Sequence, residues 1–237
     1  MNLCIIQARL GSSRFKKKIF QEINGQKIIE IVYKRVSQSK KINKILIATT
    51  KSKIDDQLVN FLKRKKIPFF RGSEKNVLDR YYRASVKFKA DDIIRITSDC
   101  PLISADFIDE HIKIYEKSNV DVVSSYLLKS YPIGVSISIC KFKILKKAWK
   151  NAVLDYDKEH VMPFVYKMKN IKIKKTKNKI FSLKKYPRLT LDYPEDLITI
   201  KNVFEYFKPK IYFSWVDVIN LYIKKKKLFS SNKNIIK

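Results

Sequence analysis

Short apolar runs alternate with longer amphipathic segments along the first half of the chain. The runs have the length of buried strands, and they lie at residues 3–7, 44–48, 67–70, 92–97 and 121–124. Between them, apolar side chains recur at helical spacing at residues 28–36, 54–64, 77–88 and 103–117, the last with Ser104 as a candidate N-cap. Because strands alternate with helices in this way in parallel, doubly wound sheets, the pattern predicts an α/β fold.

The second half of the chain alternates less regularly. We predict strands at residues 135–139 and 188–191, helices at residues 142–153 and 158–167, and a strand with an exposed loop at residues 169–179. Pro194 favours the first position of a further helix, with Glu195 and Asp196 in its first turn. This half therefore continues the α/β pattern with an irregular insertion.

No internal repeat and no linker rich in Gly, Pro or Ser divides the chain. We therefore expect one domain at residues 1–229, with residues 126–187 as a smaller lobe, and a polar tail at residues 230–237 that frays. Hydrophobic residues at 45% and aromatic residues at 12% supply a core, which excludes a disordered chain.

Signals for export, membrane insertion and disulfide bonding are missing from the sequence. No apolar run approaches the roughly 18 residues of a transmembrane helix, and the first residues lack the features of a signal peptide. The cysteines are far apart and form no C-x-x-C pair, which argues against a disulfide framework or a zinc site: Cys4, Cys100 and Cys140. We expect a cytoplasmic protein.

The chain carries a formal net charge of +30, from 52 basic and 22 acidic residues. Such a charge is typical of polyanion-binding proteins, but the lysines are spread along most of the chain and no RNP-like, KH or zinc-finger pattern is present. A lysine-rich, glycine-poor composition is also what AT-rich coding bias produces on a solvated surface. Charge alone leaves both interpretations open, and we expect no specific nucleic-acid partner.

Glycine is scarce, so its positions are informative. We expect the four glycines where the backbone needs a positive φ or a close approach, and they are Gly11, Gly25, Gly72 and Gly134. Arginine stands on either side of Gly11 and directly before Gly72. Gly11 lies in the segment QARLGSSRFKKK, residues 7–18, where a strand leads into a Gly/Ser loop with several cations, as in a backbone cradle for phosphates. The segment is not a Walker A loop, and a basic surface loop has the same composition.

Two aspartates end predicted strands. Asp99 stands in RITSDCPL and Asp192 in RLTLDYPEDL. Each is compatible with a simple turn or helix start. Together with a phosphate loop they predict a metal–nucleotide site, because Mg²⁺ is usually held by one or two carboxylates and substrate phosphates.

These segments resemble the cytidylyltransferase family that includes the acylneuraminate and 3-deoxy-manno-octulosonate activating enzymes, and most of all its branch named for spore coat polysaccharide biosynthesis protein F. The resemblance continues in order along nearly the whole chain. It rests on IIQARLGSSRFKKK at residues 5–18, FRGS at 70–73, VLDRYY at 77–82, RITSDCPL at 95–102, EHVMP at 159–163, RLTLDYPED at 188–196 and FSWVDV at 213–218.

The resemblance implies a nucleotide-diphospho-sugar transferase (GT-A-like, Rossmann-like) fold: a mixed, mostly parallel sheet flanked by helices, with a smaller lobe for sugar binding and dimerisation. It implies nucleotide binding by Ala8, Arg9, Gly11, Ser12, Arg14, Lys18, Arg71, Gly72, Arg80, Thr97 and Asp99. Catalytic roles fall on Arg9, Arg14, Lys18 and Asp99, and Mg²⁺ binding on Asp99 and Asp192. Acceptor binding falls on Tyr131, Gly134, Glu159 and His160, although His160 is equally compatible with a structural role.

Two departures from the family pattern stand out. The family's L-P-G-K is replaced by Phe15 and three lysines that end at Lys18, so the Pro-Gly turn is missing. After Y-P-x-G the family often continues with D-x-E, where this chain has Ser136 and Ser138. The replacement of D-x-E by Ser136 and Ser138 lies on the side of the site where we expect the sugar to bind.

We therefore predict a Mg²⁺-dependent cytidylyltransferase, a homodimer that transfers CMP from CTP to an acidic keto-sugar for surface polysaccharide synthesis. Two alternatives remain. One is a nucleotidyltransferase for another base or for a sugar 1-phosphate, or a glycosyltransferase of the same fold. The other is a catalytically inactive polyanion-binding protein.

Overall fold

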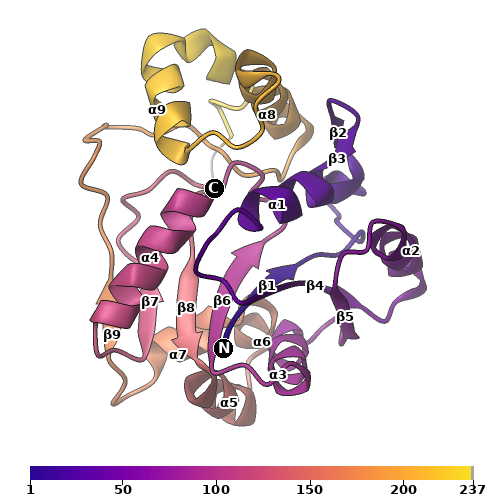
Figure 1. Cartoon of the computed structure of the whole chain (residues 1–237), viewed down its shortest axis with the longest axis vertical. Coiled ribbons are helices and arrows are strands. Elements are labelled where there is room, and N and C mark those ends of the chain that lie inside the picture. The colour runs from indigo at the N-terminus through magenta and orange to yellow at the C-terminus, as the bar shows by residue number, and fades with distance from the viewer. Residues whose placement is uncertain (236–237) are drawn as a thin grey trace.

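A computed structural model describes residues 1–235 of the chain. Within them, a seven-stranded sheet forms the centre, in the order β5-β4-β1-β6-β8-β7-β9 (Figure 1). Its strands are β1 (Asn2–Gln7), β4 (Lys44–Thr50), β5 (Phe69–Gly72), β6 (Asp92–Thr97), β7 (Val122–Ser124), β8 (Ser138–Lys141) and β9 (Ile173–Lys175). All neighbouring pairs are parallel except those that β8 makes with β6 and β7. The sheet is therefore mixed and mostly parallel, as predicted.

The strand order reverses direction at β1. From β1 the chain moves outward to β4 and β5, and then crosses back to β6 on the other side of β1. Ligands of open α/β sheets bind at such a switch point, beyond the carboxyl ends of the strands. The loop that follows β1 starts at this point.

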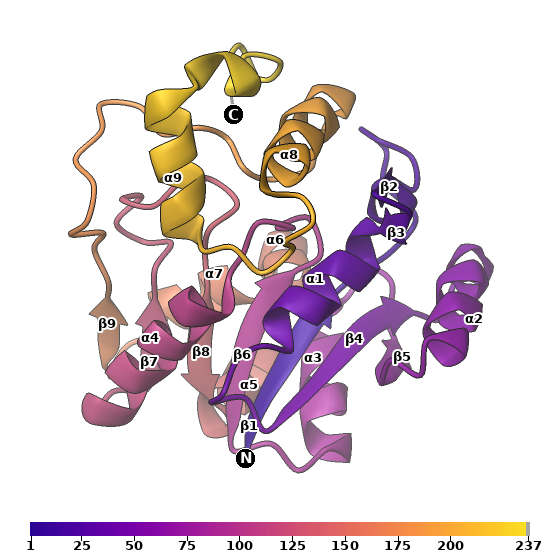
Figure 2. The ribbon, with the colours of Figure 1, turned by 45° about the horizontal axis from the view of Figure 1, so that its top comes forward.

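Helices cover both faces of the sheet, because alternate strand residues supply two separate cores. One face packs against α1 (Ile28–Val36), α2 (Asp56–Arg64), α4 (Ala105–Lys117), α8 (Pro194–Phe207) and α9 (Trp215–Lys224). The other packs against α3 (Val77–Lys87), α5 (Phe142–Asn151), α6 (Asp155–His160) and α7 (Met162–Lys167). Figure 2 shows α8 and α9 at the end of the sheet opposite the N-terminus, beyond the carboxyl end of β1.

Short elements complete the fold. A small hairpin joins β2 (Glu22–Ile23) and β3 (Gln26–Lys27), and 3-10 turns lie at Lys18–Phe20, Lys53–Asp55 and Lys226–Phe229. No helix among residues 1–235 is long and apolar enough to cross a membrane.

The predicted strand at residues 188–191 is wrong. This segment joins no strand ladder, because its backbone N–H groups bond to loops: Leu189 donates to Ile133 at 2.7 Å and Leu191 to Asp99 at 2.8 Å. Its alternating apolar side chains, Leu189 and Leu191, are nevertheless fully buried. The alternating burial therefore reflects an extended segment, residues 188–191, that crosses the end of the sheet without pairing with a strand.

Three other boundaries differ from the prediction. The strand expected at residues 135–139 starts at Ser138, and the helix expected at residues 158–167 is two short helices separated at Val161, whose φ is +69°. Ser104 stands at the N-cap of α4, but its hydroxyl accepts a hydrogen bond from the backbone of Trp215 at 3.1 Å. The serine therefore joins α4 to α9.

The C-terminal tail is bound where it is described. Asn232 is 2% exposed and donates to the carbonyl oxygen of Arg188 at 3.0 Å and to Oδ1 of Asp196 at 2.8 Å, so fraying is wrong for this residue. Residues 236–237 of the predicted tail lie outside the described residues. The smaller lobe at residues 126–187 stays a prediction.

Candidate active site

The loop that follows β1 is anchored at its start. The backbone N–H of Ala8 donates to Ala48 at 3.0 Å, and that of Leu10 donates to Oδ1 of Asp55 at 2.7 Å. Asp55 is 1% exposed and also accepts a hydrogen bond from the Thr50 hydroxyl at the end of β4. One buried carboxylate thus fixes the loop to the neighbouring strand. Asp55 was not predicted as a site residue, since an aspartate at a helix start carries no signal of such a distant partner.

Three predicted site residues meet where this loop ends. The Lys18 ammonium lies 3.1 Å from Oδ2 of Asp99 and 3.0 Å from Oδ1 of Asp192. Lys18 begins a 3-10 turn, Asp99 follows β6, and Asp192 precedes α8. The structure therefore brings residues from three distant segments together at the carboxyl ends of β1 and β6.

Hydrogen bonds between the two aspartate loops hold these carboxylates near each other. The carbonyl oxygen of Asp99 accepts from the backbone N–H of Leu191 at 2.8 Å and from the Thr190 hydroxyl at 3.1 Å. The same contacts that keep residues 188–191 out of the sheet thus place Asp192 opposite Asp99.

Gly134 packs closely against the segment that carries Asp192. Its φ is +97°, and a Cβ at this position would lie 2.4–2.5 Å from the backbone of Leu189 and Thr190. Only glycine permits both this conformation and this approach. Gly134 therefore fixes the segment that carries Asp192, while the acceptor contact expected of it stays a prediction.

A charged network surrounds Asp192 on its buried side. Arg188 contacts Oδ2 of Asp192 at 2.7 Å and Oδ1 of Asp196 at 2.9 Å. Asp196 also accepts the backbone N–H groups of Asp192 and Tyr193, at 2.8 and 3.0 Å, and so caps α8. Arg188 and Asp196 belong to the motif RLTLDYPED, but the sequence predicted no role for either residue. Their spacing of four residues from Asp192 is visible in the sequence, but their function as its supports is not.

Charge attraction controls the ionisation of the central residues. Burial alone would raise the pKa of Asp99, but the Lys18 ammonium and a hydrogen bond from Thr97 together outweigh it and hold this pKa below its usual range. Burial likewise opposes the charge of Lys18, and the two aspartates outweigh it and raise the pKa of Lys18. Lys18 and Asp99 are therefore both charged at neutral pH.

The backbone conformation of the family's Pro-Gly turn is retained although both residues are replaced. Lys17, which stands where the family pattern has glycine, has a φ of +50° and a left-handed conformation. Non-glycine residues adopt this conformation at a cost of roughly 1 kcal/mol. The turn that presents Lys18 is thus retained with a less favourable residue.

Of the two predicted loop arginines, one contacts the aspartate site and the other contacts α6. Arg14 lies 3.5 Å from Oδ1 of Asp192 and 5.5 Å from the centre of the Tyr193 ring. Arg9 lies 3.7 Å from Oε1 of Glu159, which brings α6 to the loop. Both guanidinium groups are exposed enough to meet a ligand.

The remaining predicted nucleotide residues divide into two groups. Arg71 binds the carbonyl oxygens of Thr50 and Ser52 at 2.8 and 3.1 Å, and the carboxylate of Asp56 at 2.7 Å, so its guanidinium holds the β4 loop in place. Arg80, in contrast, is 2% exposed, and its Nε and Nη1 have no hydrogen-bond partner in the described structure. Burial lowers the pKa of Arg80, and the nearby charge of Arg9 acts in the same direction.

Glycine geometry explains the position of Arg80. A Cβ on Gly72 would lie 2.9 Å from Cγ of Arg80, so the glycine makes room for the arginine side chain. A Cβ on Gly11 would meet only Glu74, at 3.9 Å. An added Cβ at Gly11 would therefore make only an ordinary contact, and the nucleotide-binding role expected of Gly11 stays a prediction.

The other predicted residues lie as follows. Ser12 accepts the backbone N–H of Phe15 at 3.4 Å within the loop, and the Thr97 hydroxyl lies 3.2 Å from Sγ of Cys100, beside Asp99. Tyr131 packs edge-on against Trp215 at 5.5 Å between ring centres, in the core cluster of the α4 and α9 face. The exposed His160 ring lies 4.5 Å from that of Tyr156, and no contact joins it to the aspartates. The acceptor roles of Tyr131 and His160 stay predictions.

The donor set at the centre fits a magnesium ion. Two carboxylates converge on one point, and a cation, the Lys18 ammonium, lies at that point. Among residues 1–235, no group of three or more His, Cys, Asp or Glu side chains could hold a metal. Mg²⁺ needs only one or two carboxylates when substrate phosphates and water complete its coordination, so Asp99 and Asp192 suffice.

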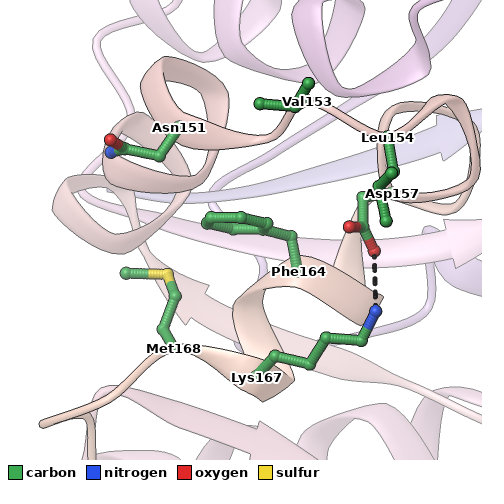
Figure 3. A pocket seen from close by; sticks show the side chains of 7 residues that line it. All are labelled: Asn151, Val153, Leu154, Asp157, Phe164, Lys167 and Met168. Carbon is green, nitrogen blue, oxygen red and sulfur yellow. Dashed lines mark hydrogen bonds and ion pairs between the residues drawn. The ribbon is translucent and has the colours of Figure 1, made fainter.

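A separate hollow offers no comparable chemistry. Figure 3 shows its lining between α5, α6 and α7, where apolar side chains surround an ion pair of 3.5 Å between Asp157 and Lys167. Its volume is about 280 Å³. Both charged groups that line it are already paired, so the aspartate site remains the candidate for catalysis.

The chain is similar to known proteins over most of its length. The family model described as cytidylyltransferase matches residues 3–235. An uncharacterized protein of Methanocaldococcus jannaschii is 38% identical over 90% of this chain and 85% of its own. The spore coat polysaccharide biosynthesis protein SpsF of Bacillus subtilis is 29% identical over 86% of each chain.

A solved structure extends the similarity to the whole fold. A cytidylyltransferase from Leptospira borgpetersenii superimposes with a TM-score of 0.90 at 28% identity, over 100% of this chain and 99% of its own. The similarity therefore includes the loop after β1 and both aspartate segments.

Proposed function

The chain belongs to the cytidylyltransferase family, and on that premise we propose that it transfers CMP from CTP to an acidic keto-sugar, with release of pyrophosphate, in the synthesis of a surface polysaccharide. The observation that carries the proposal is the convergence of Lys18, Asp99 and Asp192 at the carboxyl ends of β1 and β6. A phosphate chain bound at this point would meet both a cationic loop and a pair of carboxylates.

The triphosphate is expected along the loop after β1. Arg9 and Arg14 flank this loop with exposed guanidinium groups, which bind phosphate oxygens through two parallel hydrogen bonds. Arg80 lies close enough to Arg9 for their charges to interact, and two of its nitrogens have no partner within residues 1–235. A buried guanidinium without an anion is costly, so we assign an anionic part of the nucleotide to this position.

In the reaction, a hydroxyl oxygen of the sugar forms a bond to the α-phosphorus and loses its proton, while the bond from that phosphorus to the β-phosphate oxygen breaks. Lys18 and the loop arginines would stabilise the negative charge that develops on the phosphates. The anchored loops supply the remainder of the effect, because they fix the reacting groups in position. Mg²⁺ held by Asp99 and Asp192 would neutralise phosphate charge and help to orient the triphosphate.

Pyrophosphate release tests the proposal. With CTP, Mg²⁺ and a keto-acid sugar such as 3-deoxy-manno-octulosonate or N-acetylneuraminate, we expect pyrophosphate and a CMP-sugar as products. Asp99→Asn should lower kcat at least ~100-fold, as loss of a charge-stabilising group does. Asp106→Asn, at an exposed position in the first turn of α4, is the matched control and should leave kcat unchanged.

Two results would contradict the proposal. Release of free nucleoside monophosphate or diphosphate would identify glycosyl transfer instead. Full activity of Asp99→Asn would remove Asp99 from the site.

A further inference from the structure

A group of polar side chains lies on the α3, α5 and α7 face of the sheet, along the strand that leads to Asp99. Arg95, Ser124 and Ser138 alternate along their strands with core residues of the opposite face, which places all three on this one. Tyr166 reaches them from α7, and its hydroxyl lies 2.9 Å from Oγ of Ser124 and 2.8 Å from Oγ of Ser138. We call these four residues the Arg95 cluster.

Arg95 has no anionic partner in this cluster. Its Nε is buried without a hydrogen-bond partner, and no ion pair joins its guanidinium to a carboxylate of residues 1–235. Burial raises the pKa of the Tyr81 and Tyr166 hydroxyls. The nearby positive charge of Arg95 has a smaller effect in the opposite direction. The side chain is half-buried, so part of it can meet a ligand.

A second unsatisfied group lies close by. Oε1 of Gln7 is buried without a partner in the described structure. Gln7 pairs with Thr97 in the register of β1 and β6, and Thr97 is two residues beyond Arg95 on the same face. The face thus presents an unpaired cation and an unpaired amide oxygen, which are complementary to an anion and to a hydroxyl.

The position of the Arg95 cluster relates it to the reacting centre. Arg95 precedes Thr97 by about 7 Å along the strand, and Asp99 follows directly beyond the strand end. In a keto-acid sugar the carboxylate is bonded to the carbon that carries the reacting hydroxyl. An acceptor whose hydroxyl lies at the α-phosphate therefore brings its carboxylate to the end of β6, towards which an extended Arg95 side chain can reach.

Ser138 keeps this guanidinium available. It stands opposite Arg95 in the antiparallel pair of β6 and β8, where directly facing Cβ atoms are about 5 Å apart. A carboxylate at position 138 would form an internal ion pair with Arg95. The serine hydroxyl, already bonded to Tyr166, cannot neutralise it.

We propose that Arg95 binds the carboxylate of the sugar acceptor and selects for acidic sugars, with Ser138 as the residue that leaves it unpaired. This inference rests on the proposed function and adds the residue that recognises the acceptor. A carboxylate is the preferred anion because its two oxygens match the planar fork of arginine. A phosphate group on a neutral sugar is the competing source of charge.

The first test compares ligands that differ only in charge. Calorimetric titration of the wild-type chain uses N-acetylneuraminate, 3-deoxy-manno-octulosonate, the methyl ester of each acid, and glucose 6-phosphate. We expect at least one acid to bind at least ~10-fold more tightly than its ester, and more tightly than the sugar phosphate. Because the titration needs no CTP, it tests Arg95 even where nucleotide transfer fails.

The second test uses variants. Arg95→Gln should weaken binding of the acid about 10-fold and bring it to the level of the ester, while Arg95→Lys should restore part of the difference. Ser138→Asp should reproduce the effect of Arg95→Gln, because the new carboxylate occupies the guanidinium. Ser138→Asn, of nearly equal size and without charge, is its matched control and should retain acid binding.

Each alternative result has a defined meaning. Failure of both acids to bind, equal binding of acid and ester, preference for the sugar phosphate, or unchanged acid binding in Arg95→Gln would overturn the assignment of Arg95. Loss of binding in folded Ser138→Asn and Ser138→Asp alike would overturn the role of charge at position 138. Absence of CTP binding by the wild-type chain would instead contradict the proposed function, and leaves the acid–ester comparison valid.

Discussion

At the scale of single residues, the position of Lys18 decides whether the site can form without a ligand. Asp99 and Asp192 would repel each other if no cation lay between them, and Lys18 separates them with contacts of 3.1 and 3.0 Å. Arg14 and Arg188 compensate part of the charge of Asp192. Lys18 is therefore both a phosphate-binding candidate and a structural counterion.

Lys18→Met should consequently destabilise the chain by about 1–3 kcal/mol, because the pair of carboxylates loses its shared cation. Mg²⁺ should restore more stability to this variant than to the wild-type chain, since the ion can replace the ammonium. Urea unfolding with and without Mg²⁺ measures both effects. Lys16→Met, at an exposed position of the same loop, is the control and should change neither. Equal stability of the two variants would show that Lys18 is not needed as a counterion.

His111 gives the molecule a pH dependence far from the site. It lies in α4, 2.8 Å from the carbonyl oxygen of Phe107 and 3.0 Å from the Thr176 hydroxyl, and burial lowers its pKa to about 4. In the unfolded chain a histidine has a pKa near 6.5. The unfolded state therefore binds the proton first, and stability falls as the pH decreases from about 6.5 towards 4.

Between pH 7 and pH 4.5 this effect should cost about 2–3 kcal/mol. His111→Gln removes the titrating group, so the wild-type chain should lose that much more stability than the variant over this interval. Urea unfolding at the two pH values gives the comparison. An equal loss in both chains would mean that His111 is protonated in the folded state.

At the scale of elements, the close contact of Gly134 with residues 189–190 aligns the two aspartate segments. Gly134→Ala should destabilise the chain by at least about 2 kcal/mol and lower activity in the variant that still folds, because the Cβ must displace the segment that carries Asp192. Gly25→Ala is the matched control. Gly25 also has a positive φ, of +73°, but no atom within 4 Å of its added Cβ, so it should cost only about 1–2 kcal/mol and leave activity intact. Thermal unfolding of both variants separates the contact from the backbone conformation, and equal costs would contradict the role of the contact.

The turn at Lys17 predicts a stabilising substitution. Lys17→Gly should stabilise the chain by up to about 1 kcal/mol, since glycine adopts the left-handed conformation without strain. The gain is reduced by the larger backbone entropy of glycine in the unfolded chain and by the lost hydrogen bond of 3.0 Å from Lys17 to Gln57. Urea unfolding measures the change, and a destabilised variant would contradict the strain at this turn.

At the scale of the whole molecule, the sequence predicted most strands and helices and the residues that converge in the site. Short apolar runs located β1, β4 and β6, because each of these strands contributes buried apolar side chains to both faces of the sheet. Asp99 and the loop that ends at Lys18 were expected at the carboxyl ends of parallel strands. Asp192 was also expected to follow a strand, but residues 188–191 form none, and the role of Lys18 came from the resemblance to the family. The homodimer, the cytoplasmic location and the smaller lobe stay predictions.

The remaining features depend on contacts between distant segments, which local patterns do not reveal. Residues 188–191 alternate like a strand, and only their bonds to Asp99 and Ile133 show that they form an extended crossing segment. Asp55 was missed because its partner Leu10 is 45 residues away in the sequence. Arg95 stands in a quoted motif, but its lack of a partner is a property of the folded chain.

Selective binding of CTP with Mg²⁺ tests the central claim most directly. Thermal unfolding at fixed ionic strength would compare CTP, UTP, GTP and ATP, each with and without Mg²⁺. A ligand at 100 times its Kd stabilises the folded chain by about 2.7 kcal/mol. We predict the largest increase in Tm with CTP, dependent on Mg²⁺ and abolished in Asp99→Asn. Equal increases with all four nucleotides, insensitive to Mg²⁺ and to Asp99, would show that the net charge of +30 binds phosphate without selection, and would contradict a cytidylyltransferase site at Lys18, Asp99 and Asp192.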